Sequence, residues 1–233
     1  MKTVILCGGL GSRLGKVTRN IPKPMVRIGA IPIIEHIMLI YKKYGYEDFI
    51  LAGGYKYQII QKYFKNHKKF KHVKVINTDK GSLTGLRLFK LKKYLRGEKN
   101  FMLTYGDGLT DQNINKLVKF HFKHKNVTTV TAVRPPVRFG ELNLNYNKVA
   151  SFAEKPQAKH GWINGGFFVF NKKIFNFLSN KNVMLETEPM NNLVKKKQLI
   201  AYKHYGFWQC MDTLREKEYL HSLYKSKKAP WIN

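Results

Sequence analysis

The stretch GGLGSRLGKVTRNIPKPM, residues 8–25, follows directly on the short apolar run TVILC. This run is rich in β-branched residues and is typical of a buried central strand. A glycine-rich turn after such a strand lies at the carboxyl edge of an open α/β sheet, where ligands bind. Glycine lets the backbone approach phosphate groups closely, and nearby cations offset the remaining charge. The stretch therefore predicts an α/β fold with a phosphate site behind its first strand.

Two common phosphate motifs do not match this loop. The Walker A pattern fails because only three residues separate Gly11 from Gly15 before Lys16, where four are required. The dinucleotide fingerprint fails because Leu14 stands where its third glycine belongs. The loop therefore indicates another phosphate geometry, and from these residues alone a purely structural turn stays open.

Strand-like and helix-like segments alternate along the first part of the chain. Strands are expected in KTVILCGG, DFILAGG, HVKVINT, FMLTYGD and VTTVTAV, and helices over 31–44 and in YQIIQKYFKN, LRLFKLKKYL and INKLVKFHFKH. Beyond Val133 we expect a hairpin in LNLNYNKVASFAE, a strand in GGFFVF and helices over 184–197 and 213–226. The alternation predicts a Rossmann-like, mostly parallel sheet with helices on both faces. We expect one domain over 1–233, with a nucleotide-binding half (1–133) and a mixed half (134–233).

The composition is strongly basic, with 43 Lys and Arg against 14 Asp and Glu and a net charge of +29. Such an excess indicates an anionic partner, which includes nucleic acid as well as a phosphorylated small molecule. The lysines are scattered, however, and a merely solvated basic surface stays open. The two cysteines form neither a disulfide framework nor a zinc motif. No membrane-length apolar run and no signal peptide are present, so we expect a cytoplasmic protein without membrane insertion.

Six motifs in a fixed order carry a family resemblance. The string GGLGSRL followed by PKPM (22–25) resembles the signature of sugar-1-phosphate nucleotidylyltransferases. The others are YGDG (105–108), EKP (154–156), NGGFFV (164–169), FWQCMDTLRE (207–216) and KAPW (228–231). Their order is most similar to the glucose-1-phosphate cytidylyltransferase branch and spans almost the whole chain. The resemblance implies the nucleotide-diphospho-sugar transferase fold and transfer of CMP from CTP to a phosphorylated acceptor, with release of pyrophosphate.

Charge neutralisation is the central problem of such a reaction, because two anions meet and a third is expelled. The second pKa of a phosphate monoester is about 6, so the nucleophile is already ionised at neutral pH and needs no general base. Cations, a metal and alignment must then supply the acceleration. By the resemblance, Arg13 and Lys23 are the catalytic cations, with Lys23 near the α-phosphate. The implied nucleotide-binding residues are Leu6, Gly8, Gly9, Gly11, Ser12, Arg13, Lys23, Ser82, Thr84, Gly85, Arg87 and Asp107.

Two aspartates are the expected metal ligands. Mg²⁺ takes one or two carboxylates together with substrate phosphates. Asp107 ends the apolar strand FMLTY between two glycines, although a plain turn would also use Asp there. Asp212 precedes a predicted helix and is locally a good N-cap. The resemblance instead assigns Asp212 to the metal site with Asp107, and Mg²⁺ is the implied cofactor.

The second half of the chain is expected to bind the acceptor. The resemblance places Tyr105, Glu154, Lys155, Asn164, Gly165 and Trp208 there. Carboxylate and amide groups can bond sugar hydroxyls, and a lysine can pair with the sugar phosphate. Without the resemblance, Glu154 and Lys155 would be an ordinary surface pair, Gly165 a bulge and Trp208 a core aromatic.

The loop NTDKGSLTGLRL (77–88) occupies the place of the family's base-recognition loop, with Ser82, Thr84 and Gly85 nearest the base and Arg87 nearest the phosphates. It departs from the family in reading TGLRL for TGGRL and in lacking a longer insertion before residue 77. We expect glucose 1-phosphate as the acceptor, and because of these departures a non-sugar phosphate such as phosphoglutamine in capsule modification stays open as the alternative. A homo-oligomer is expected. The alternative of another class is a basic nucleic-acid-binding protein, but no recognition module for nucleic acid is present.

Overall fold

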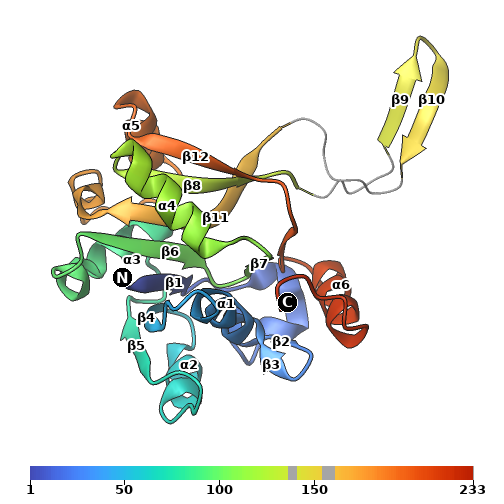
Figure 1. Ribbon diagram of the computed structural model, residues 1–233. Helices are drawn as coiled ribbons and strands as arrows, with labels where there is room; N and C mark the ends of the chain where they lie inside the picture. The colour runs from blue at the N-terminus through green and yellow to red at the C-terminus, as the bar shows by residue number, and fades with distance from the viewer. Residues whose placement is uncertain (136–140, 154–160, 233) are drawn as a thin grey trace.

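A seven-stranded sheet organises the chain in the computed structural model, which describes residues 1–135, 141–153 and 161–232 (Figure 1). In order across the sheet its strands are β12 (Leu199–His204), β8 (Thr128–Val133), β11 (Ile163–Asn171), β6 (Asn100–Tyr105), β1 (Thr3–Cys7), β4 (Asp48–Gly53) and β5 (His72–Asn77). All neighbouring pairs are parallel except those of β11, which runs antiparallel to β6 and β8. The predicted mostly parallel sheet is confirmed.

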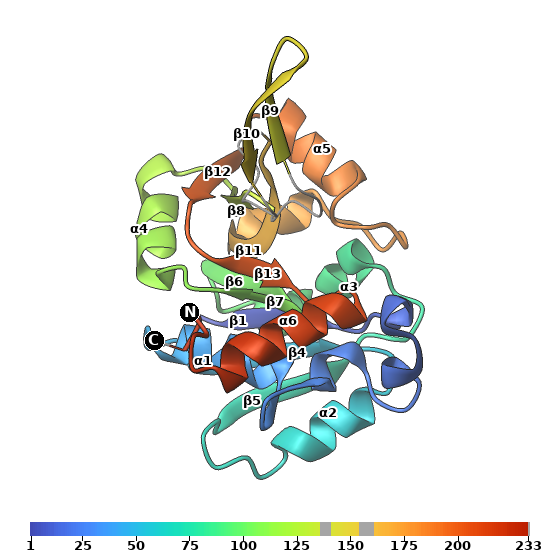
Figure 2. The ribbon, with the colours of Figure 1, turned by 90° about the vertical axis from the view of Figure 1, so that its right-hand side faces the viewer.

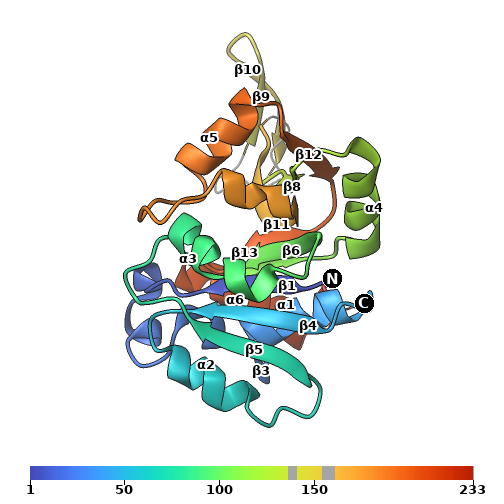
Figure 3. The same cartoon turned by 90° about the vertical axis from the view of Figure 1, so that its left-hand side faces the viewer.

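Helices cover both faces of this sheet (Figures 2 and 3). One face packs against α1 (Ile33–Lys42), α2 (Tyr57–Phe64), α4 (Ile114–His124) and α6 (Leu214–Lys225). The other packs against α3 (Thr84–Lys90), α5 (Glu188–Lys195) and the 3₁₀ turns Lys92–Leu95 and Lys172–Asn176. Side chains of β1 alternate between the two cores, as strand geometry requires: Ile5 and Cys7 enter one, Val4 and Leu6 the other.

Two helices differ from the sequence expectation by more than two residues or by a break. The segment LRLFKLKKYL divides into α3 and a separate 3₁₀ turn. The last helix before β12 begins at Glu188 and not at residue 184, with Pro189 in its first turn. Proline has no N–H to give to a helix interior, so it is tolerated only at such a start. Strand β12 was not expected from the sequence, whereas the hairpin of β9 (Glu141–Asn145) and β10 (Lys148–Ala153) was.

Two very short ladders complete the fold. Strands β2 (Arg27–Ile28) and β3 (Ile31–Pro32) pair before α1. Strands β7 (Gly108–Thr110) and β13 (Trp208–Cys210) pair antiparallel, with Cys210 opposite Gly108. Just outside this second ladder, the Met211 N–H donates to the Asp107 carbonyl at 2.9 Å. The ladder therefore places Asp107 beside Asp212, although the sequence separates them widely.

Across the described residues, no helix has the length and apolar character needed to cross a lipid bilayer.

Candidate active site

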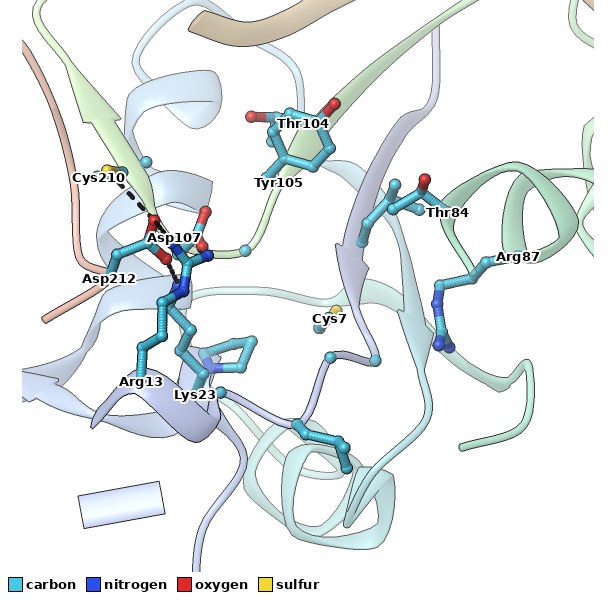
Figure 4. Close-up of a pocket in the computed structure, with 18 of the residues that line it drawn as sticks. Cys7, Arg13, Lys23, Thr84, Arg87, Thr104, Tyr105, Asp107, Cys210 and Asp212 are labelled. Atoms are coloured by element: carbon cyan, nitrogen blue, oxygen red, sulfur yellow. Dashed lines mark hydrogen bonds and ion pairs between the residues drawn. The ribbon is translucent and has the colours of Figure 1, made fainter. Parts of the chain in front are cut away.

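A cavity of about 510 Å³ opens at the carboxyl edge of the sheet (Figure 4). Strands β1 and β6 both end there, and β11 begins there because it runs the opposite way. The lining consists of residues 6–13 and 104–108 with Lys23, Pro24, Thr84, Arg87, Gly165, Trp208, Cys210 and Asp212. This is the position at which open α/β sheets bind their ligands.

The glycine-rich loop exposes backbone to this cavity. A side chain added at Gly9 would meet nothing within 4 Å, so this backbone is open to a ligand. Gly11 has φ +66°, and an added Cβ would lie 2.9 Å from the Lys23 Cβ. Its left-handed conformation and close packing therefore both require glycine. The Thr18 hydroxyl donates to the Gly11 carbonyl at 2.9 Å and fixes the turn.

Two cations and two carboxylates meet at one end of the cavity (Figure 4). The Lys23 ammonium lies 2.5 Å from Asp107 Oδ2 and 2.5 Å from Asp212 Oδ1. The Arg13 guanidinium reaches Asp212 Oδ2 at 3.0 Å, with its side chain 71% exposed, whereas that of Lys23 is only 12% exposed. Burial alone would lower the pKa of Lys23, but the adjacent carboxylates of Asp107 and Asp212 outweigh burial and raise it. Lys23 is therefore a fixed cation at this site.

The start of α6 decides which residue caps the helix and which faces the cavity. Thr213 is the N-cap: its side chain accepts from the Glu216 N–H, while Glu216 accepts from the Thr213 N–H at 2.8 Å. This reciprocal pair is a capping box. The local interpretation of Asp212 as the cap is therefore wrong, and the carboxylate of Asp212 is directed to Lys23 and Arg13.

The carboxylates of Asp107 and Asp212 fit a magnesium ion in number and chemistry. They converge on one ammonium group, so they face one another across a gap that already holds a cation. In the described part of the chain, no three His, Cys, Asp or Glu side chains gather as a self-sufficient metal site. A cation there would complete its shell with substrate phosphates and water, as Mg²⁺ characteristically does.

Arg87 lies beneath the loop as a buried cation. It is 3% exposed, and it donates to the Gly53 carbonyl at 2.9 Å, the Ser82 carbonyl at 2.6 Å and the Thr78 hydroxyl. Burial lowers the pKa of its guanidinium. Arg87 therefore joins the end of β4 to the loop between β5 and α3, and its guanidinium packs against the backbone of Gly8.

Gly8→Ala is expected to destabilise the protein, because the new methyl group would collide with the Arg87 guanidinium. Arg87 cannot move aside without leaving its buried acceptors, and overpacking of this kind costs about 1–3 kcal/mol of unfolding free energy. Thermal denaturation should show a clear fall in the melting temperature. Gly9→Ala is the matched control, since a methyl group there meets nothing. Equal melting temperatures for the two variants would contradict this account of Arg87.

Comparison with known proteins decides the family. The family model described as nucleotidyl transferase matches residues 2–212. The chain belongs to the nucleotidyl transferase family. The glucose-1-phosphate cytidylyltransferase of Salmonella typhimurium is 42% identical over 253 aligned positions, which cover 99% of this chain and 98% of that protein. The probable glucose-1-phosphate cytidylyltransferase of Bacillus subtilis is 37% identical and matches 99% of both chains.

Solved structures of other nucleotidyl transferases share the fold. A UDP-glucose pyrophosphorylase complexed with UDP-glucose superimposes with a TM-score of 0.76 at 16% identity, covering 97% of this chain and 98% of the other. The inositol-1-phosphate CTP transferase of T. maritima gives 0.72 at 18% identity, covering 96% of each. At these identities the likeness concerns the fold alone.

At another part of the cavity wall, where the sequence predicted acceptor contacts, Tyr105 and Trp208 meet the start of β11. The Trp208 indole N–H donates to the Gly165 carbonyl at 2.8 Å. The Asn164 amide donates to the Tyr105 hydroxyl at 3.2 Å and accepts from the Gly166 N–H at 2.8 Å. The Tyr105 hydroxyl in turn donates to Glu186. Burial, followed by the Glu186 charge, raises the pKa of Tyr105, so its proton stays in place at neutral pH.

Most of the site residues expected for this nucleotidyl transferase line the cavity, namely Leu6, Gly8, Gly9, Gly11, Ser12, Arg13, Lys23, Thr84, Arg87, Tyr105, Asp107, Gly165, Trp208 and Asp212. Ser82, Gly85 and Asn164 do not line it directly: Ser82 bonds Arg87 and Lys90, Gly85 packs on Val183, and Asn164 acts through Tyr105. Glu154 and Lys155 lie outside the described residues.

Several lining residues escaped the sequence analysis, namely Cys7, Leu10, Pro24, Thr104, Gly106, Gly108 and Cys210. Six of them directly adjoin an expected residue in the chain, and Cys210 lies two positions from both Trp208 and Asp212. Inclusion of every residue of each motif would have predicted them. Burial raises the pKa of the Cys210 thiol to about 12, with a further contribution from Glu216 and Asp212. This lining thiol is therefore protonated and unreactive at neutral pH.

Proposed function

We propose that this nucleotidyl transferase transfers CMP from CTP to glucose 1-phosphate, giving CDP-glucose and pyrophosphate. The observation that carries the proposal is the 42% identity to a glucose-1-phosphate cytidylyltransferase along almost the full length of both chains. The cavity supports it chemically, because a glycine-rich loop, two cations and two facing carboxylates surround one space.

In this proposal the chain's own residues position and neutralise the reactants. Lys23 supplies a buried point charge for the α-phosphate, and exposed Arg13 supplies a planar fork for the outer phosphate oxygens. The open backbone at Gly9 gives the triphosphate close access. The acceptor phosphate is ionised at neutral pH, so no side chain has to remove a proton. Mg²⁺ held by Asp107 and Asp212 would neutralise further phosphate charge.

The proposed acceptor end of the cavity is formed by Tyr105, Gly165 and Trp208, with Asn164 acting behind Tyr105. Glu154 and Lys155 are proposed as further acceptor contacts from the sequence motif alone. Trp208→Phe keeps the apolar ring and removes the N–H that bonds Gly165. Because a lost hydrogen bond of this kind is worth about 1 kcal/mol, we expect a roughly fivefold rise in acceptor KM with the CTP KM little changed. Steady-state kinetics with each substrate varied in turn checks this, and a selective rise in CTP KM would place Trp208 on the nucleotide side.

A non-sugar acceptor such as phosphoglutamine is the second candidate. The alignment to the Salmonella relative spans 253 positions, so at least 20 positions of that protein have no counterpart in this chain. A shortened region is a place where acceptor choice could differ between the two proteins. The nucleotide, metal and transfer chemistry would be the same.

Pyrophosphate release tests the proposal. CTP and Mg²⁺ are offered with glucose 1-phosphate, other hexose 1-phosphates, phosphoglutamine and glycerol phosphate, with ATP, UTP and dTTP as nucleotide controls. We expect release with CTP and glucose 1-phosphate and its loss on addition of EDTA. Turnover of CTP with phosphoglutamine alone would favour the second candidate. Silence with every pair would overturn both.

The compartment, the assembly and the use of the product are proposed as follows. We propose a cytoplasmic homo-oligomer whose product feeds surface polysaccharide synthesis. The proposed phosphorylated substrates support a compartment rich in nucleotides. Sedimentation of the purified protein with and without CTP tests the assembly.

A further inference from the structure

A short segment before α5 ties the base-recognition loop to the second half of the chain. The Leu83 N–H donates to the Asn182 side chain at 2.8 Å, and the Gly85 N–H donates to the Val183 carbonyl at 3.0 Å. A Cβ at Gly85 would lie 2.8 Å from that same carbonyl, so the two backbones are in close contact. Figure 3 shows α3 and α5 on the same side of the sheet. Residues 182–186 therefore form a strap, and Glu186 is its last member.

The carboxylate of Glu186 joins two residues of the cavity wall. Its Oε2 accepts from the Thr84 hydroxyl at 2.6 Å, and its Oε1 accepts from the Tyr105 hydroxyl. Thr84 and Tyr105 both line the cavity, whereas Glu186 itself does not. Oε2 thus holds Thr84, on the proposed nucleotide side, and Oε1 holds Tyr105, on the proposed acceptor side.

Both hydroxyls direct their one proton at Glu186, so this position is best matched by two acceptor oxygens. The Thr84 hydroxyl already accepts from the Leu185 N–H at 2.8 Å, and the Tyr105 hydroxyl already accepts from the Asn164 amide at 3.2 Å. Each hydroxyl carries one proton, and both hydroxyls donate that proton to Glu186. A carboxylate has two acceptor oxygens, whereas an amide has one acceptor and one donor group. With glutamine in place of Glu186, the proton of one of the two hydroxyls would therefore face a donor group and have no acceptor.

We infer that Glu186 is a positioning residue that fixes Thr84 and Tyr105 against one another, so that the nucleotide and acceptor subsites are held in one geometry. The naming of the two subsites rests on the proposed function. Glu186 acts through the two hydroxyls and touches neither substrate. A change at Glu186 should consequently alter the KM of both substrates at once.

The test is the effect of Glu186→Gln on the two KM values. We expect both to rise by about tenfold, with kcat within about threefold of the wild type, since each substrate meets a misplaced wall residue. Glu186→Asp keeps the charge but shortens the reach, so it should not restore either KM. Glu188→Gln is the matched control, because it removes an exposed carboxylate two positions along that is not bonded to Thr84 or Tyr105. Both KM values of Glu186→Gln within twofold of the Glu188→Gln values would overturn the inference.

A double-mutant cycle separates positioning from general structural damage. Thr84→Val should raise the acceptor KM in the wild type, because it releases one end of Glu186, but should raise it no further in Glu186→Gln. Equal effects of Thr84→Val in both backgrounds would contradict the inference. Wild-type turnover is measured first: failure with CTP and glucose 1-phosphate counts against the proposed function only. The variants are then compared with the nucleotide and phosphate acceptor that the wild type uses.

Discussion

Asp107→Asn should lower kcat by on the order of 10³-fold, because the amide loses the charge that would hold Mg²⁺ against the triphosphate. Asp212→Asn should act similarly, since its carboxylate faces the same ammonium as that of Asp107. Neither change removes apolar packing, and Lys23 keeps one carboxylate partner in each variant. Single-turnover kinetics over a range of Mg²⁺ concentrations measures the effect, and an increased Mg²⁺ requirement should accompany the loss.

Asp111→Asn is the matched control for these variants. Asp111 follows the same ladder but pairs with His204 at 2.9 Å outside the cavity lining. It should keep wild-type turnover and Mg²⁺ dependence. Near wild-type rates in both Asp107→Asn and Asp212→Asn would refute their assignment as metal ligands.

Lys23→Ala is expected to lower kcat by about 10²–10³-fold, the range found when one preorganised electrostatic group is removed from a transition state. The ammonium is held almost buried and charged beside two carboxylates, at the position proposed to contact the α-phosphate. Among the described residues, removal also leaves Asp107 and Asp212 with Arg13 as their one remaining ion-pair partner. The variant should therefore bind Mn²⁺ without nucleotide more tightly than the wild type does, which paramagnetic resonance titration can measure.

Lys16→Ala provides the comparison. Lys16 lies in the same loop and carries the same charge, but it is exposed and does not line the cavity. Its loss should change kcat by less than twofold. If Lys16→Ala and Lys23→Ala reduced kcat equally, the effect would come from the general basic charge and not from a placed cation.

The alternation of apolar runs was enough to predict the sheet, because strand and helix periods differ and the first half of the chain follows them cleanly. Strands β1, β4, β6 and β8 lie where the runs predicted them. Strand β12 was missed because LIAYKH, at the sheet edge, carries a weak alternating pattern rather than a continuous apolar run. The short β7 and β13 strands carry no periodicity at all, so their pairing is a tertiary property.

The motifs were enough to predict the two aspartates and the two cations, but not the ion pairs that they form with one another. The resemblance led to Asp212 while its local context favoured a helix cap. The spacing of Thr213 and Glu216 is nevertheless that of a capping box. Asp212 is therefore not needed to cap the helix. Glu186 carried no comparable signal, because its role depends on two hydroxyls that are 102 and 81 positions away in the chain. Arg87 was expected nearest the phosphates and lines the cavity, but its bonds to two buried carbonyls and a hydroxyl could not be predicted from the motif.

The most direct test is ³¹P NMR of the wild-type enzyme with CTP, glucose 1-phosphate and Mg²⁺. We expect the CTP and sugar phosphate signals to decrease together, while the paired doublets of a diphosphate-linked sugar nucleotide and the signal of pyrophosphate appear in equal amounts. Omission of either Mg²⁺ or the acceptor should leave CTP unchanged. Conversion of CTP to CDP and orthophosphate regardless of the acceptor, or an unchanged spectrum under all conditions, would contradict the central claim that this cavity catalyses cytidylyl transfer.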